Sequence, residues 1–307
     1  MEFRKYQHIE RWGTTEVDGI ENGTCWVFPK LDGTNASVWW DPDAEGRVCF
    51  GSRNRKLSSE FDNHGFVKSM CEQDTYDRFW ELFHHSPHWR LYGEWLVPHT
   101  LKTYREIAWR NFYVFDVWDG FTESGAGHIP WEIYSPVLLN AGISCVDPMC
   151  SIENPTAENI LREVNKNTYL IEDGKGLGEG VVVKNYRWVN KYGRQTWAKM
   201  VRNEFKEENG KEMGFRELKG TEIVELKLAD RFCTRSLVDK VAAKIEGEAG
   251  GWSSKLIPRL LQTVYYDMVR EESWEMVKTL KNPKVIDYSR LQKLVTQRVK
   301  VLLPELF

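Results

Sequence analysis

The sequence predicts an α+β protein with two domains, a strand-rich domain over residues 1–208 and a small all-helical domain over residues 215–307. Three observations support this fold class. Short apolar runs of strand length, separated by turn residues, recur as far as residue 201. Residues 207–212 are charged and turn-like, which is typical of a linker. Beyond this linker, apolar residues recur at helical rather than strand spacing.

The composition indicates an ordinary soluble globular protein, with 41% hydrophobic and 28% charged residues. No stretch approaches the roughly 18 uninterrupted apolar residues of a membrane span, and the start resembles neither a signal peptide nor a transit peptide. We therefore expect a cytoplasmic protein without a membrane partner. The six cysteines lack the paired spacing of a zinc site and are expected to be buried, reduced thiols.

The net charge of −3 argues against a protein that coats nucleic acid nonspecifically, but it leaves room for local basic tracks. Residues 47–56 contain arginines and a lysine without any acid, and residues 184–206 alternate basic with aromatic side chains and include a single acid. This combination suits a polyphosphate or a nucleic-acid backbone. The alternative is a solvated strand-loop-strand face whose aromatic residues belong to the core.

The first strands flank Lys30. Apolar, strand-like runs cover residues 24–28 and 36–40, so a short loop on a sheet would present this lysine. Gly33 allows a tight turn, and Asp32 can accept hydrogen bonds from the turn's amides. A free lysine has a pKa of about 10.4, so a nucleophilic Lys30 needs nearby cations or desolvation to lower that pKa. A lysine before a turn can equally be a structural residue.

The next elements are predicted from the same patterns. A strand over residues 47–53 would bring Arg53 back beside the pocket. Residues 66–83 follow helical spacing loosely and predict a packing helix that ends near Pro87.

Two further strands, at residues 91–95 and 111–118, would place Glu94, Phe115 and Asp116 at strand ends or along strand faces.

A helix is predicted to open at residues 154–155, because asparagine caps helices and proline fits a first turn, and to run to about residue 164. The glycine-rich residues 173–178 lack the lysine-serine/threonine ending of a phosphate loop, so we interpret them as a flexible connector. Strands over residues 180–184 and 195–201 follow. Helices are then predicted over residues 223–245, 256–276 and 288–303.

The order of motifs resembles that of the covalent nucleotidyltransferases, which comprise DNA ligases, RNA ligases and mRNA capping enzymes. By itself, Lys-x-Asp-Gly at residues 30–33 is a weak signal. Five further matches follow in the family's order and spacing, and the resemblance implies an antiparallel-sheet nucleotidyltransferase domain. The matches are Ser52-Arg53-Asn54, Tyr92-Gly93-Glu94-Trp95, Phe112-Tyr113-Val114-Phe115-Asp116, Gly178-Glu179-Gly180-Val181-Val182-Val183-Lys184 and Trp197-Ala198-Lys199.

The resemblance implies a relay of three steps at phosphorus. Lys30 attacks the α-phosphate of ATP and releases pyrophosphate, the adenylate passes to a 5′-phosphate, and a 3′-hydroxyl then displaces AMP to seal the strand. Positioning and charge neutralisation supply most of the rate of such in-line displacements. ATP and a divalent metal, Mg²⁺ or Mn²⁺, are therefore the expected cofactors.

The same resemblance assigns roles to the cations. Lys184 and Lys199 join Lys30 as catalytic residues, because they would lower the pKa of Lys30 and hold the phosphates. Arg53 would hold a phosphate or the ribose through its planar guanidinium.

It also assigns roles to an aromatic ring and three carboxylates. Phe115 would stack on adenine, and Glu94 would bond the ribose hydroxyls. Glu179 and Asp116 would help with the metal or with the attacking strand. The alternatives are that Phe115 is a core residue and that Glu94 is an ordinary strand-end carboxylate.

A helical tail behind this catalytic domain resembles the nick-sealing RNA ligases of phages and some cellular organisms, and residues 3–6 resemble the start of the phage enzymes. Two positions depart from that pattern. Pro29 stands where an acidic residue commonly helps to read adenine, and Val201 stands where a second lysine is usual after Lys199. Arg202 follows one place later, but strand residues alternate faces, so it would replace that lysine only across a bulge.

We therefore expect an ATP-dependent RNA ligase that acts as a monomer at nicks in duplex RNA or an RNA-containing duplex. A minimal ATP-dependent DNA ligase is the competing enzyme, and a ligase-like module that binds nucleic-acid ends without catalysis is the competing non-enzyme. Retention of Lys30, Glu94, Glu179, Lys184 and Lys199 argues against the second alternative. The sequence leaves open the choice of RNA or DNA on the 3′-hydroxyl side.

Overall fold

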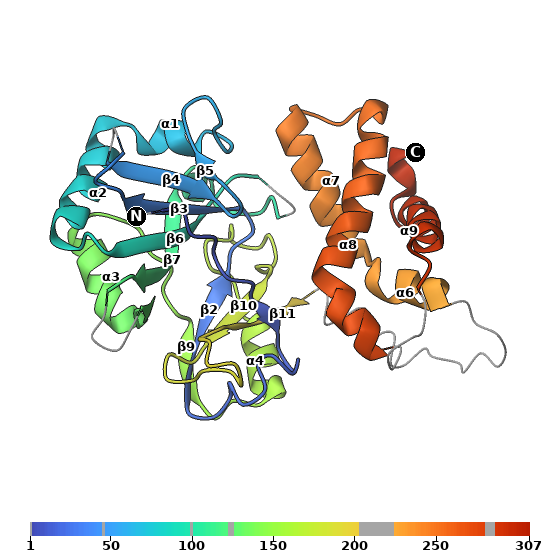
Figure 1. The fold of residues 1–307 in the computed structure, drawn as a ribbon, viewed down its shortest axis with the longest axis horizontal. Coiled ribbons are helices and arrows are strands. Elements are labelled where there is room, and N and C mark those ends of the chain that lie inside the picture. Colours follow the sequence, from blue (N-terminus) through green and yellow to red (C-terminus); the bar gives the residue numbers. More distant parts are fainter. Residues whose placement is uncertain (1, 45–46, 99–100, 122–125, 203–223, 280–285) are drawn as a thin grey trace. The chain divides into compact units, whose positions relative to one another are not determined.

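The computed structural model describes residues 2–44, 47–98, 101–121, 126–202, 224–279 and 286–307 (Figure 1). The chain divides into two compact units, Met1–Arg202 and Asn203–Phe307. The predicted linker at residues 207–212 lies outside the described residues.

The first unit contains two sheets, as the predicted α+β class requires. One sheet has the strand order β1-β11-β10-β2-β9, and all its pairs are antiparallel except the parallel pair β1–β11. Its strands are β1 (Glu10–Arg11), β2 (Thr24–Lys30), β9 (Cys150–Glu153), β10 (Gly180–Lys184) and β11 (Ala198–Val201).

The other sheet has six strands in the order β5-β4-β3-β6-β7-β8, and every neighbouring pair is antiparallel. The predicted antiparallel architecture is therefore confirmed. The strands are β3 (Thr34–Trp40), β4 (Val48–Ser52), β5 (Lys56–Leu57), β6 (Trp89–Trp95), β7 (Phe112–Asp119) and β8 (Gly127–His128).

Helices α1 (Phe66–Met70), α2 (Gln73–His85) and α3 (Trp131–Asn140) lie beside the six-stranded sheet (Figure 1). Their apolar side chains pack with those of the sheet in the largest core of this unit. The single helix predicted over residues 66–83 is thus two helices. Glu72 breaks it, because this residue has an extended backbone, with φ −60° and ψ 136°. A short 3₁₀ helix, η1 (Glu106–Ala108), lies in the loop between β6 and β7.

Helix α4 (Ala157–Val164) begins later than predicted. Thr156 is its cap: the hydroxyl accepts from the backbone N–H of Asn159, whose side chain accepts in return from the Thr156 N–H. Asn154 instead has a positive φ of 46°, and its side-chain oxygen accepts from the N–H of Gly23. An asparagine therefore joins β9 to the start of β2 rather than capping the helix.

In its described residues the second unit is entirely helical, as predicted, and has its own apolar core. The first predicted helix is broken in two at Thr234, whose hydroxyl caps the second part by accepting from the N–H of Leu237. The elements are α6 (Val224–Phe232), α7 (Arg235–Ala249), η2 (Ser254–Leu256), α8 (Ile257–Thr279), α9 (Tyr288–Leu302) and η3 (Pro304–Leu306).

None of the described helices combines the length and apolar character that a membrane crossing requires. All six cysteines are free thiols, in agreement with the expectation of reduced cysteines. Cys71 is exposed, so the expectation that all of them are buried is wrong. It lies just past the end of α1, where its N–H closes the last turn.

Candidate active site

Lys30 is the last residue of β2 and lies opposite Gly180 of β10, which in turn lies opposite Val201 of β11. Residues directly opposite each other in a sheet point to the same face, and so do alternate residues along a strand. Lys184 and Lys199 occupy positions of the same parity on β10 and β11. The sheet therefore presents all three predicted catalytic lysines on one face.

Gly180 allows β10 and β11 to approach closely beside Lys30. A Cβ atom at this position would lie 2.3 Å from the carbonyl oxygen of Met200 and 2.8 Å from the Cα of Val201. Any side chain here would push β11 away. The glycine of the motif is therefore required by packing, with no positive φ involved.

Lys30 is surrounded by carboxylates. Its Nζ donates a hydrogen bond to Oε2 of Glu179 at 2.6 Å, and the two side chains are 21% and 20% exposed. Burial lowers the pKa of Lys30, but the negative charges of Glu179, Glu94 and Asp32 outweigh burial and raise that pKa above its usual value. The expectation that neighbouring lysines lower the pKa of Lys30 is therefore wrong for this structure, in which Lys30 is an ammonium group.

Glu94 lies in β6, and its Oε1 accepts from the backbone N–H of Gly33 at 2.9 Å. Burial raises the pKa of Glu94 to about 7, although Lys30 and the Gly33 N–H favour the charged form. At Gly33 a Cβ atom would lie 2.5 Å from the carbonyl oxygen of Trp95. The glycine thus permits β3 to pass close to β6, and the turn needs no positive φ.

Asp32 makes two hydrogen bonds to residues that follow β6. Its carboxylate is buried and accepts from the N–H of Leu101 at 2.6 Å, and its own N–H donates to the Tyr104 hydroxyl at 2.9 Å. Leu101 and Tyr104 are thereby held next to the turn that follows Lys30.

Phe115 sits at a β-bulge. Gly93 of β6 is opposite Val114 and Tyr92 is opposite Asp116, so Phe115 has no partner on β6. A bulge interrupts the alternation of a strand and redirects its side chains, and bulges are frequent beside active sites. This one explains how adjacent residues Phe115 and Asp116 both point away from the helix-covered core.

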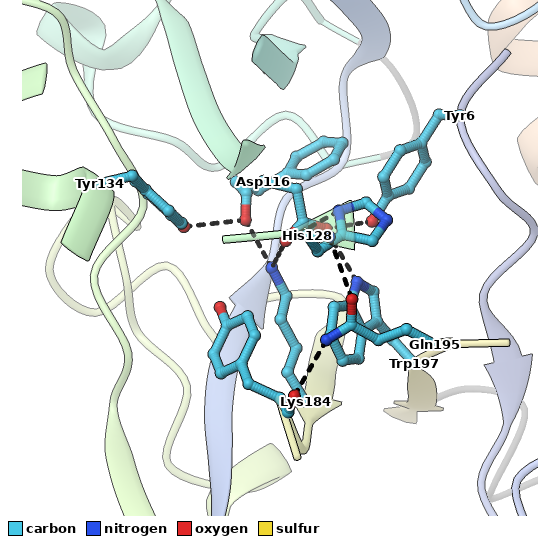
Figure 2. Close-up of polar contacts among 9 residues, drawn as sticks. Tyr6, Asp116, His128, Tyr134, Lys184, Gln195 and Trp197 are labelled. Atoms are coloured by element: carbon cyan, nitrogen blue, oxygen red, sulfur yellow. Dashed lines mark hydrogen bonds and ion pairs between the residues drawn. The ribbon is translucent and has the colours of Figure 1, made fainter. Parts of the chain in front are cut away.

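Asp116 is completely buried, and both its oxygens are engaged (Figure 2). Oδ1 accepts from Nζ of Lys184 at 2.8 Å, and Oδ2 accepts from the Tyr6 hydroxyl at 2.5 Å and from Nε1 of Trp197 at 2.9 Å. A carboxylate so enclosed is unsuited to bind a metal that also contacts a substrate. The structure therefore argues against Asp116 as a metal ligand.

Lys184 is 2% exposed and donates to the Phe115 carbonyl oxygen at 2.5 Å as well as to Asp116. Its Nζ also lies 4.4 Å from the centroid of the Phe28 ring. Burial lowers the pKa of Lys184, and the Asp116 carboxylate opposes this effect. Here Lys184 supports Phe115 from the protein interior and does not contact Lys30.

Lys199 and Arg202 differ in their place on the sheet. Lys199 lies within β11 opposite Val182, and the pairing of β11 with β10 has no register shift. Arg202 follows the last residue of β11, and its N–H donates to the carbonyl oxygen of Glu179 at 3.0 Å. The bulge that would let Arg202 replace the residue at Val201 is absent from this strand pair.

Arg53 lies in the turn between β4 and β5, half-buried, with Nη2 3.4 Å from Nδ1 of His8. It belongs to the six-stranded sheet, as do Glu94 and Phe115. The three lysines belong to the five-stranded sheet, and Glu179 directly precedes β10 of that sheet. The candidate site is thus assembled from both sheets.

Two contributors were missed by the sequence reasoning. Tyr6 bonds Asp116, and its segment carried only a short, weak resemblance. Asn167 is buried, donates from Nδ2 to the Gly180 carbonyl at 2.7 Å, and accepts at its own carbonyl from Gly178, so it fixes the chain on both sides of Glu179. The connector before Glu179 is therefore anchored rather than free, and no sequence signal marked Asn167 for this task.

The family model described as RNA ligase matches residues 23–201, which is more than half of the chain and includes all the site residues predicted from the sequence. The chain belongs to the RNA ligase family. No curated protein matches it.

Solved structures of a Naegleria gruberi RNA ligase are similar to this member of the RNA ligase family. A mutant of that protein with ATP and Mn has 18% identity and a TM-score of 0.49, and the match covers 67% of this chain and 58% of that chain. The form with PPi has 19% identity and a TM-score of 0.48, covering 68% and 58%. The match thus spans well under two thirds of the Naegleria protein, and the family assignment here depends on the family model.

If Lys199 holds phosphates in this RNA ligase family member, Lys199→Ala should slow transfer of AMP to the protein by about 100-fold, and Arg202→Ala by less than about fivefold. The reason is that Lys199 shares the sheet face of Lys30, whereas Arg202 lies beyond the strand. Labelling with ATP radioactive at the α-phosphate measures both rates. Equal losses would show that Arg202 also supplies phosphate-binding charge.

Glu179→Gln should lower the pKa of Lys30, because the Glu179 carboxylate favours the ammonium form and burial favours the neutral amine. Acylation of Lys30 by an amine-reactive reagent, followed by mass spectrometry, should then be roughly tenfold or more faster at a fixed pH near 8. Glu163→Gln, at the exposed pair with Lys166, is the matched control and should leave the Lys30 profile unchanged. An unaltered profile in Glu179→Gln would contradict the assigned cause.

Proposed function

We propose that this protein is an ATP-dependent RNA ligase that joins 3′-hydroxyl and 5′-phosphate ends through a lysyl-AMP intermediate on Lys30. Its substrate is a nick in duplex RNA or in an RNA–DNA hybrid, and it acts as a monomer. The observation that carries the proposal is the environment of Lys30: the lysine ends a strand, contacts Glu179, and shares one sheet face with Lys199, within the segment that matches the family.

ATP suits the groups that the two sheets provide. Phe115 offers a ring for adenine, at a bulge that frees it from strand alternation. Glu94 offers a carboxyl for the ribose hydroxyls, and Arg53 and Lys199 offer cations for phosphates.

A divalent cation, Mg²⁺ or Mn²⁺, suits the carboxylates. Glu179, Glu94 and Asp32 place three acidic groups around one ammonium group. Burial, with a smaller contribution from the other two acids, raises the pKa of Glu94 to about 7, so a negative charge on Glu94 is unfavourable there. Hard cations prefer such oxygen donors. The described residues hold no ready cluster of three His, Cys, Asp or Glu ligands, so Glu179 would share the ion with substrate phosphates, where it neutralises charge.

The three proposed steps use the residues of this chain as follows. Lys30 attacks the α-phosphate as a free amine, a phosphorus–nitrogen bond forms, and the bond to pyrophosphate breaks. Because Glu179 holds Lys30 as an ammonium, Glu179 must turn to another partner and the proton must leave before the attack. In the later steps a 5′-phosphate oxygen displaces Lys30 from AMP, and a 3′-hydroxyl oxygen displaces AMP from the activated 5′ end.

The proposal is tested with ATP labelled at the α-phosphate and Mg²⁺. A covalent adduct stable to alkali and labile to acid, as a phosphoramidate should be, is expected. The adenylated protein is then offered four nicked duplexes with RNA or DNA on each side of the nick, and sealing is expected at nicks that contain RNA. Fastest sealing of the all-DNA nick would identify a minimal DNA ligase. Binding of nicks without any adduct would identify a non-catalytic end-binding module.

A further inference from the structure

The first residues of the chain form a strap, defined as residues 2–12, that lies across both sheets. The Phe3 ring packs at 5.9 Å from that of Trp39 in β3, and the Arg4 guanidinium lies 4.2 Å from the Trp118 ring of β7. The strap ends in β1, which pairs with β11 beside Lys199. The strap thus contacts β3 and β7 of the six-stranded sheet and β11 of the five-stranded sheet, and these two sheets are the two walls of the candidate site.

The middle of the strap is Tyr6, which is 5% exposed. Its ring packs on Phe115 at 5.0 Å and on Tyr92 at 4.9 Å between centroids. Its hydroxyl donates to Oδ2 of Asp116 at 2.5 Å (Figure 2). One side chain therefore supports Phe115 directly through its ring and reaches Asp116 through its hydroxyl.

Asp116 joins the two sheets. It lies in β7 of the six-stranded sheet, and its Oδ1 binds Lys184 at the end of β10 in the five-stranded sheet. The start of β10 is Gly180, opposite Lys30, and Glu179 precedes it. The Asp116–Lys184 pair thus sets the position of Phe115, on one wall, relative to Lys30 and Glu179 on the other.

A buried ion pair keeps its geometry only when the remaining hydrogen-bonding capacity is satisfied. Tyr6 and Trp197 supply the two donors to Oδ2. His128 is a further titratable group beside Asp116, with Nδ1 at 4.0 Å from Oδ1, and Tyr92, Tyr134 and Tyr186 also interact with this carboxylate electrostatically. Burial lowers the pKa of His128 to about 4, so it carries no charge near neutral pH, and burial raises the pKa of Tyr6, which stays a donor. The tyrosine hydroxyl is therefore one of few groups that hold this carboxylate in place.

We propose that Tyr6 is a positioning residue for transfer of AMP to Lys30, an inference that rests on the proposed function. Its hydroxyl orients Asp116. Asp116 in turn holds Lys184 on the Phe115 carbonyl, and this contact fixes the position of one wall of the site relative to the other. Its ring supports Phe115, the proposed adenine platform. The hydroxyl should affect the rate of the chemical step, because a shift of the α-phosphate relative to Lys30 slows in-line attack. The ring should affect the binding of ATP.

The test is the rate of AMP transfer measured against ATP concentration in wild-type protein and three variants. Tyr6→Phe keeps the ring and should lower kcat roughly tenfold, the loss expected of one hydrogen bond to a charged group, with KM within about twofold. Tyr6→Leu should also raise KM for ATP. Tyr92→Phe is the matched control, because the Tyr92 hydroxyl donates to the Arg4 carbonyl oxygen of the same strap at 3.0 Å and is not one of the donors to Asp116. Both constants should stay within about twofold of wild type.

A double-mutant cycle shows whether Tyr6 acts through Asp116. Tyr6→Phe added to Asp116→Asn should cause no further loss, because the hydroxyl would have lost the carboxylate that it orients. Additive losses, a wild-type kcat in Tyr6→Phe, or equal losses in Tyr92→Phe would overturn the proposal. If Tyr6→Phe fails to fold in a thermal melt, Trp197→Phe, which removes the other donor to Oδ2, takes its place in the cycle with the same expected result. Failure of the wild-type protein to form an adduct would instead overturn the proposed function itself.

Discussion

Lys30→Ala is expected to abolish formation of the protein–AMP adduct, with a loss of at least about 1000-fold in the rate of labelling by ATP radioactive at the α-phosphate. Neither of the other two lysines predicted to be catalytic is placed to take over. Lys184 is 2% exposed and bonded to Asp116 and the Phe115 carbonyl, and Lys199 lies two strands away from Lys30 across β10.

The appropriate control for this variant is Lys30→Arg. Alanine removes the positive charge from among three carboxylates and should destabilise the site, whereas arginine can keep the ion pair with Glu179 but cannot act as the nucleophile. Lys30→Arg should therefore melt close to wild type and still form no adduct. Labelling that survives either substitution would place the nucleophile elsewhere and overturn the mechanism.

Removal of the helical unit is expected to separate AMP transfer from strand joining. A protein that ends at residue 209 should take AMP from ATP at a rate within a few fold of the full chain, but seal nicks on the order of 100-fold more slowly. All candidate ATP-binding residues lie before residue 202, and the two units have separate apolar cores. A duplex, by contrast, must be held by phosphate contacts over a wider surface.

The salt dependence of nick binding provides a second measurement. Its slope reports the number of phosphates that the protein neutralises, so it should be shallower in the truncated protein than in the full chain. Strong sealing by the truncated protein would assign the helical unit to another task, such as partner binding. Loss of AMP transfer in a fragment that circular dichroism shows to be folded would mean that the helical unit completes the nucleotide pocket.

The local elements were accessible from the sequence because they depend on short-range patterns. The apolar runs at residues 24–28, 91–95 and 180–184 lie in β2, β6 and β10, and most of their side chains are buried, as expected for short apolar runs of strand length. The family motifs were accessible for a similar reason, since each is a contiguous stretch whose residue types suit nucleotide chemistry. Helix breaks at Glu72 and Thr234 escaped this reasoning, because the apolar spacing continues across both.

What the side chains do was decided by the tertiary structure. Lys30 and Glu179 are 149 positions apart in the chain, and the pairing of β2 with β10 brings their side chains to 2.6 Å, where the carboxylate raises the pKa of Lys30, the proposed nucleophile. The bulge at Phe115 exists only in the register of β7 against β6. The bulge helps bring Asp116 to Lys184 and Tyr6. Asp116, which was expected to help with the metal or with the attacking strand, is here a buried carboxylate that binds these two side chains. The charge state and the burial of a side chain depend on its neighbours in space. The register between paired strands selects those neighbours, and a single segment of sequence does not determine that register.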